Sequence, residues 1–169
     1  MQGGKDKSKM DNNTIRRIAM EQSAYECNCT WEDFLSDENN VHLSVATDKA
    51  RKYLELPHIC NFVSYGTNIV AAGQEELLPE MEQFLHSVTD IEKCFETPVL
   101  YLINKILEKA DGRICFMADY FLPDLDQVFR LDLPCTYELK VMEAAEFEEL
   151  YIPAWKNALC ADRKHLDRL

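Results

Sequence analysis

One stretch, residues 97–122, constrains the fold more than any other part of the 169-residue sequence. Pro98 suits the first turn of a helix, where its missing N–H is not needed. The apolar residues that follow recur at helical spacing and predict one buried stripe: Leu100, Ile103, Ile106 and Leu107. Gly112 ends this helix, because glycine accepts a left-handed C-terminal conformation without strain. The apolar run Arg113–Leu122 (RICFMADYFL) then predicts a central strand, buried on both faces, around which the remaining elements pack.

The rest of the N-terminal region alternates between predicted helices and strands. Hydrophobic periodicity predicts a helix over 11–25 capped by Asp11 or Asn12, a short helix over 31–35, a strand over 41–46, two strands over 59–65 and 68–72, and a helix over 75–88. Thr30 and Asp33 have the spacing of a capping box, and Gly66-Thr67 between two strands predicts a hairpin. The predicted fold class is α+β, with a mixed or antiparallel sheet flanked by helices.

Composition divides the chain into four predicted parts. Residues 1–10 are polar and predict a disordered tail, and residues 11–122 form the N-terminal α+β region. Residues 123–134 are acidic and bounded by prolines, which is typical of a connector between domains. Residues 135–169 then begin a new set of elements, and their helical pattern continues to the last residue of the sequence. We therefore expect an incomplete second domain at this end.

Charge and hydropathy exclude several partners. The formal net charge is −12 at pH 7, so we expect no nucleic-acid partner and no anionic membrane partner, both of which need clustered Lys and Arg. No apolar run approaches the length of about 18 residues that a membrane helix needs. The N-terminus has no apolar segment typical of a signal peptide, and the seven cysteines are scattered. Together these features predict a cytoplasmic protein with free thiols.

Cysteine motifs offer two candidate sites, each with a simpler alternative. Cys27-x-Cys29 has the form of half a metal site, but a structural zinc site usually needs a second such pair and the sequence has none, so we predict no metal. His58 and Cys60 share one face of an alternating strand and suggest a Cys–His nucleophile. Nothing in the local sequence supplies the electropositive setting that a reactive thiolate needs, so a half-buried strand pair is the default interpretation.

Three further motifs are explained by turns and helix ends. Asp124-x-Asp126 has the form of a divalent-cation chelate, although aspartate is expected in a turn. Gly73 stands between a strand and a helix, where backbone amides bind phosphate in other proteins, but a tight turn also explains it. Four acidic residues could bind a cationic substrate, and as a first helical turn they complement the helix dipole: Glu143, Glu146, Glu148 and Glu149. Local motifs alone therefore assign no chemistry and no catalytic residue.

The C-terminal part carries a strand-then-helix pattern and one aromatic pair of interest. Alternation over 136–142 predicts a strand with one solvent-exposed face, and a helical register over 147–159 predicts a helix that Pro153 kinks or divides. Trp155, with Asn157 two residues later, could line a groove for a ligand. The alternative is that Trp155 packs in the core, because it falls on the apolar stripe of the helix.

This run of residues, TYELKVMEAAEFEELYIPAWKNALCADRKHLDRL, resembles the opening strand and first helices of a GNAT-type N-acetyltransferase domain. Upstream, LPHICNFVSYGTNIVA, CFETPVLYLINKILEK and RICFMADYFLPD resemble the N-terminal region of a bacterial subgroup of this family, largely uncharacterised. The resemblance covers most of residues 11–169 and rests on whole segments. It implies that residues 135–169 are the opening β-α-α part of a GNAT-like domain.

The resemblance implies acetyl transfer from acetyl-CoA to a small-molecule or peptide amine. The family holds the cofactor with a Q/R-x-x-G-x-G/A turn that this sequence lacks, so it implies no cofactor-binding residue here and an inactive chain on its own. It places the first helices beside the acceptor, which makes Tyr151, Trp155 and Asn157 the candidate substrate-binding residues. The alternative is a non-catalytic interaction or dimerisation module with a degenerate GNAT-like fold. Dimerisation through residues 137–142 would cover an unpaired strand edge.

Overall fold

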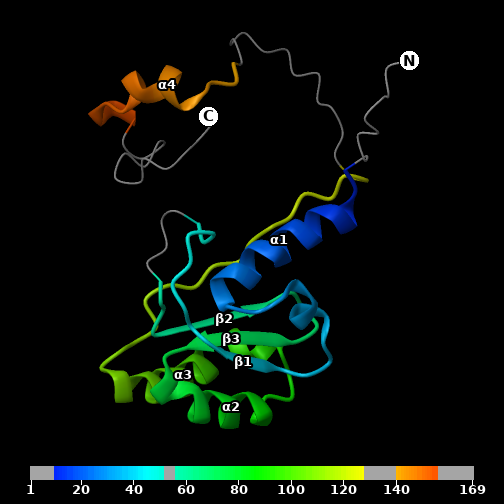
Figure 1. Ribbon diagram of the computed structural model, residues 1–169, viewed down its shortest axis with the longest axis vertical. Coiled ribbons are helices and arrows are strands. Elements are labelled where there is room, and N and C mark those ends of the chain that lie inside the picture. Colours follow the sequence, from blue (N-terminus) through cyan, green and yellow to red (C-terminus); the bar gives the residue numbers. More distant parts are fainter. Residues whose placement is uncertain (1–9, 52–55, 128–139, 156–169) are drawn as a thin grey trace. The chain divides into compact units, whose positions relative to one another are not determined.

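The computed structural model describes residues 10–51, 56–127 and 140–155, which fall into two compact units, 1–128 and 129–169. The first unit is an α+β fold built on a small three-stranded mixed sheet (Figure 1). Its helices and strands are α1 (Asn12–Cys27), β1 (Asn40–Leu43), β2 (Cys60–Ser64), β3 (Ile69–Gly73), α2 (Leu78–Ser87) and α3 (Thr97–Leu107). Short 3₁₀ turns join them: η1 (Trp31–Leu35), η2 (Glu75–Leu77), η3 (Glu92–Phe95) and η4 (Glu108–Ala110).

β3 is the central strand of the sheet and is buried along its whole length. It pairs with β1 in parallel and with β2 in an antiparallel hairpin, so the order is β1-β3-β2. Ile69 and Ala71 point into a core formed with α2 and α3. Val70 and Ala72 point to the other face, which α1 and η1 cover (Figure 1). The sheet is thus sandwiched between helical layers.

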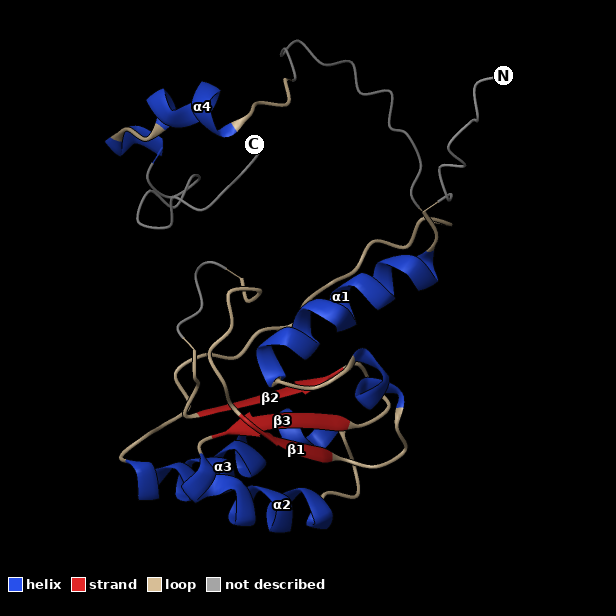
Figure 2. Cartoon of the chain, in the orientation of Figure 1, coloured by secondary structure: helices blue, strands red, loops and turns tan. Residues whose placement is uncertain are grey.

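The predicted central strand Arg113–Leu122 is wrong, because this segment pairs with neither edge of the sheet. It runs as an extended loop, tan in Figure 2, with the Ile114 amide bound to the Asn104 side chain at one end. Most of its large apolar side chains are exposed, up to 92% for Phe121. The central position belongs instead to β3, whose small alanines and glycine let helical layers pack closely on both faces. An apolar run alone does not distinguish a buried strand from an exposed extended segment.

Most of the other elements predicted for this unit are confirmed. The hairpin joins β2 to β3, and Thr30 is the N-cap of η1 in the predicted capping box, where its N–H donates to the Asp33 carboxylate over 2.8 Å. Asp11 caps α1, because its carboxylate accepts a hydrogen bond from the Thr14 amide. The strand predicted over 41–46 ends earlier, at Leu43, where the chain leaves the sheet. Among the described residues, no helix has the length and apolar character needed to cross a membrane.

The described part of the second unit, residues 140–155, consists of short helical turns. They are α4 (Ala144–Phe147), η5 (Glu148–Leu150) and η6 (Pro153–Trp155). The helix predicted over 147–159, which Pro153 was expected to kink or divide, is thus interrupted in its described part, and residues 156–159 lie outside the described residues. The break falls at Tyr151 and Ile152, because a proline at the next position disfavours helical backbone before it. The predicted division at Pro153 is confirmed. Residues 136–139 of the predicted strand lie outside the described residues, and residues 140–142 are not in a strand.

Candidate functional site

The predicted substrate-binding residues lie at the end of the described second unit. Tyr151 is half-buried and packs edge-on against Phe147, with ring centroids 6.1 Å apart. Phe147 is buried, whereas 52% of Trp155 is exposed. Asn157, the third predicted residue, lies outside the described residues. The structure therefore places Tyr151 directly after η5 and Trp155 at the end of η6, with the indole open to solvent.

The four acidic residues near α4 include one pair that organises the start of this helix. The Glu146 carboxylate forms an ion pair with Lys140 at 2.7 Å and accepts a hydrogen bond from the backbone N–H of Glu143 over 2.9 Å. These two contacts lower the pKa of the Glu146 carboxyl. Glu146 thus closes the N-terminal turn of α4, as its interpretation as a first helical turn predicts. Glu148 and Glu149 are exposed.

The two cysteines of Cys27-x-Cys29 face different surroundings. Cys27 is the last residue of α1 and is fully buried, where its sulfur accepts a weak hydrogen bond from Asn61 at 3.7 Å. Burial raises the pKa of its thiol far above the usual range. Asn28 then takes a left-handed conformation, with φ at 54°, and turns the chain at the helix end. Cys29 consequently leaves the core and is only half-buried.

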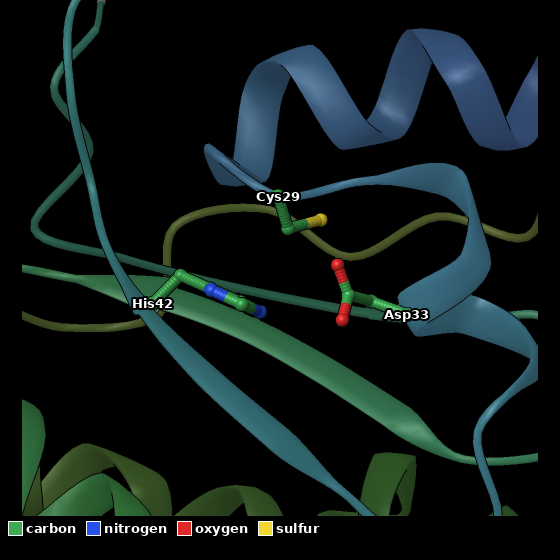
Figure 3. Close-up of side chains that lie close together, drawn as sticks. All are labelled: Cys29, Asp33 and His42. Atoms are coloured by element: carbon green, nitrogen blue, oxygen red, sulfur yellow. The ribbon is translucent and has the colours of Figure 1, made fainter.

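Three half-buried side chains that could ligate a metal converge on one point: Cys29, Asp33 and His42. Their ligand atoms all lie within 4.8 Å of one another. Figure 3 shows the thiol, the carboxylate and the imidazole pointing into the same space from three different segments. Among the residues that the structure describes, no other group of three or more His, Cys, Asp and Glu side chains comes together in this way.

Local structure holds each of the three side chains in place. The Cys29 amide donates to Ala24 O over 3.0 Å, which fixes the turn after α1. The Asp33 Oδ2 atom accepts hydrogen bonds from both the amide and the hydroxyl of Thr30, each at 2.8 Å. His42 lies on β1 and pairs with Ala72 of the central strand. The site thus rests on a helix end, a capped turn and a strand.

A further hydrogen bond joins two of these segments. The Asn28 side chain donates to Leu43 O over 3.1 Å and so ties the turn before Cys29 to the strand that carries His42. The Nε2 atom of His42 is buried and has no hydrogen-bond partner among the described residues. A buried nitrogen without a partner costs free energy unless something else binds it. The geometry therefore leaves one ligand atom of the cluster unsatisfied.

The electrostatics of the cluster oppose a thiol nucleophile. Burial, together with the negative charge of Asp33, raises the pKa of the Cys29 thiol to about 12. A catalytic cysteine needs a lowered pKa, supplied by a nearby cation or a helix N-terminus. In a nucleophilic triad, moreover, the carboxylate sits on the far nitrogen of the imidazole rather than beside the thiol. Here the thiol, carboxylate and imidazole converge on one space instead.

The predicted pair of His58 and Cys60 does not form a nucleophile either. Burial raises the pKa of the Cys60 thiol to about 12 and lowers that of the His58 imidazole. The His58 amide donates to the buried Ser44 hydroxyl over 2.8 Å, which anchors the loop that enters β2. Within the described part of the chain, no hydrogen bond joins the His58 and Cys60 side chains. Both side chains are half-buried, as the default interpretation predicts, but only Cys60 lies on a strand, because β2 begins at Cys60 and His58 lies in the loop before it.

Turn formation explains the Asp124-x-Asp126 motif. The Asn12 side chain donates to Asp124 over 2.7 Å and accepts a hydrogen bond from the Leu125 amide, also at 2.7 Å. Asp124 in turn accepts from the Asp126 amide at 3.0 Å, as aspartate often does in turns. These bonds fasten the end of the extended segment to the start of α1.

Gly73 is explained by close packing at the end of β3. A Cβ atom there would lie 2.5 Å from the sulfur of Met81. The next amide, of Gln74, already donates to Ile59 O over 3.0 Å, so this junction offers no free amide at that position to a phosphate. The sequence correctly placed Gly73 between a strand and a helical segment, but the reason for the glycine is the approach of α2.

Sequence reasoning weighed Cys29 only as a partner of Cys27 and missed Asp33 and His42. Asp33 was explained by its capping box, which is present, and His42 by its strand. No signal within a single segment could have joined the three residues, because they lie on three separate segments that only the fold brings together. Comparisons of the chain with protein-family models, curated proteins and solved structures find no match. The GNAT-type resemblance thus stays a prediction.

Proposed function

We propose that the protein is a GNAT-like N-acetyltransferase, of which residues 135–169 open the acetyltransferase domain. The support is the whole-segment resemblance over most of residues 11–169, together with an α+β fold of the described N-terminal unit that is compatible with it. In this proposal the cofactor is acetyl-CoA, the acceptor is a small-molecule or peptide amine, and the location is cytoplasmic. The alternative class, a non-catalytic module, differs in having no acetyl transfer at all.

The observation that carries the proposal for this chain's own residues is the exposure of Trp155. A tryptophan that served only the core would be largely buried, yet 52% of Trp155 is accessible. Tyr151, one turn earlier, is half-buried against the fully buried Phe147. Aromatic faces attract ammonium groups and pack against the carbon atoms next to them. An exposed indole four residues after a tyrosine that packs on Phe147 therefore suits a surface that receives an amine before its acetylation.

Replacing Trp155 with alanine should raise the KM for the amine acceptor about fivefold and leave the KM for acetyl-CoA unchanged. The reason is that the indole contacts only the acceptor. The measurement is steady-state release of the CoA thiol, with the longest protein that the gene encodes and a panel of small amines and peptides. Phe121→Ala removes another exposed aromatic and should alter neither constant. An unchanged acceptor KM would remove Trp155 from the site, and no turnover of any amine would refute acetyl transfer.

One observation favours the second candidate function, a dimerisation module. The segment Cys115–Leu122 presents several large apolar side chains to solvent: Phe116, Met117, Tyr120, Phe121 and Leu122. Exposed apolar surface of this kind often marks a protein interface. Light scattering after size-exclusion chromatography should then give the mass of a dimer for the wild type, and that of a monomer for the Phe116→Ser/Phe121→Ser variant. A wild-type monomer at every concentration would contradict this second function.

A further inference from the structure

The cluster of Cys29, Asp33 and His42 has the composition of a transition-metal site. Thiolate, imidazole and carboxylate are the three side-chain types that bind zinc in proteins. A tetrahedral zinc ion with bonds of about 2.0–2.3 Å holds its ligand atoms about 3.3–3.8 Å apart. The three ligand atoms here lie within 4.8 Å of one another, so small side-chain rotations close the site. We propose that this cluster binds a zinc-type divalent ion through three protein ligands.

Hydrogen bonds to the proposed ligands support this use of the side chains. Both bonds from Thr30 fall on the Oδ2 atom of Asp33, which leaves Oδ1 for an ion. Such outer contacts orient ligating carboxylates in metal proteins. The buried Nε2 atom of His42, which has no partner among the described residues, gains one in the ion. The ion would also compensate the two negative charges that a thiolate and a carboxylate place together.

The fourth coordination position is open in this arrangement. Among the described residues, no fourth His, Cys, Asp or Glu side chain joins the three ligands. Sites with three protein ligands keep their fourth position for water or for a ligand from outside, whereas structural zinc sites use four protein ligands. An ion at this site would therefore keep a fourth position at which water or an outside ligand can exchange.

A surface pocket of about 360 Å³ borders the cluster and indicates which ligand would enter. Cys29 and Lys49 are both among the residues that line it, whereas Asp33 and His42 are not, so the cluster meets this pocket at Cys29. The Lys49 ammonium lies 4.8 Å from the ring centroid of Tyr25, a second wall residue. The thiolate and carboxylate already neutralise a divalent ion, so a further positive charge is needed to favour an anionic fourth ligand, and Lys49 in the lining of this pocket offers one. The proposed ligand is accordingly a small anion.

Cobalt(II) added to the full chain tests the metal site, because a thiolate–cobalt bond gives a charge-transfer absorption band. The band should appear in the wild type, persist in Cys115→Ser, whose thiol is exposed and outside the cluster, and disappear in Cys29→Ser. His42→Gln should weaken cobalt binding at least tenfold, and far-UV circular dichroism checks that each variant is folded. A folded Cys29→Ser variant that keeps the band would overturn the site.

Azide, a small anionic metal ligand, then tests the open position on the cobalt-loaded protein. It should shift the cobalt d–d bands saturably, and Lys49→Gln should weaken its binding about threefold, the effect of one exposed charge. Lys93→Gln, outside the pocket, should leave azide binding unchanged. Bands that do not respond to azide would overturn the open position while leaving the metal site intact. Either result leaves acetyl transfer as a separate question, since it involves other residues.

Discussion

Replacing Arg51 with methionine should lower the free energy of unfolding by about 3 kcal/mol. The guanidinium of Arg51 holds the Glu26 carboxylate with hydrogen bonds of 2.7 Å and 2.5 Å. Only 2% of the Glu26 side chain is accessible, so removal of its partner leaves a buried charge without compensation. Two neutral bonds to Glu26 remain in this variant, from the Gln22 side chain at 3.0 Å and from the backbone N–H of residue 51 at 3.3 Å, and they are too weak to replace an ion pair. Urea unfolding followed by circular dichroism measures the loss.

Two further variants separate the buried charge from packing. Glu26→Gln in the Arg51→Met background removes the uncompensated charge and should recover most of the lost stability. Lys93→Met breaks the ion pair with Asp90, in which both side chains are exposed to solvent. This variant should leave the free energy of unfolding nearly unchanged. A double variant as unstable as Arg51→Met would show that Arg51 acts through its carbon chain instead, because long cationic side chains also pack.

The pH dependence gives an independent check on the same pair. Burial raises the pKa of Glu26, but the hydrogen bonds from Arg51 and Gln22 and the charge of Arg51 outweigh it, so the pKa of the folded state is lowered. A lowered folded-state pKa contributes stability that is present above the unfolded-state pKa and lost as the pH falls through the folded-state pKa. The difference between wild type and Arg51→Met should therefore be full at neutral pH and shrink in acid. A constant difference at all pH values would contradict the ionic origin.

The sequence predicted the elements of this fold better than their assembly. The hairpin, α2 and α3 follow from signals that lie within each segment, such as Gly66-Thr67 between two strands and Pro98 at a helix start. The central strand was misassigned because RICFMADYFL is more apolar than the IVAAG of β3. Which strand lies at the centre of the sheet depends on which strands pair. Between two helical layers, a strand of small residues fits the central position better than a strand of large ones. Periodicity contains no information on pairing.

The cluster of Cys29, Asp33 and His42 was beyond prediction for a related reason. Cys27 and Cys29 are close in sequence, yet the left-handed Asn28 sends them to opposite environments. Asp33 and His42 come from separate segments, and a local explanation for each was complete. Only the packing of η1 and β1 against the end of α1 brings the three side chains together.

For Trp155 the sequence register suggested a core position, and the structure exposes it because the helix breaks before Pro153.

Replacing Phe34 with alanine should lower the free energy of unfolding by about 4 kcal/mol. Phe34 is fully buried on the α1 face of the sheet, and its ring meets Tyr65 edge-on with centroids 5.1 Å apart. Truncation leaves a cavity among side chains that are themselves buried, including Met20 and Val70, so the neighbours can close it only in part. Phe34→Leu keeps most of the volume and should cost less than about 1.5 kcal/mol. Urea unfolding of both variants measures these losses.

Phe121→Ala is the matched control, because it removes an equal ring from a position that is 92% exposed. It should leave the free energy of unfolding within about 0.5 kcal/mol of the wild type. The two phenylalanines thus distinguish the fold described here from the one that the apolar run suggested. If Phe121→Ala destabilised the protein as much as Phe34→Ala, the segment Arg113–Leu122 would have to be a buried strand, and β3 would no longer account alone for the centre of the sheet.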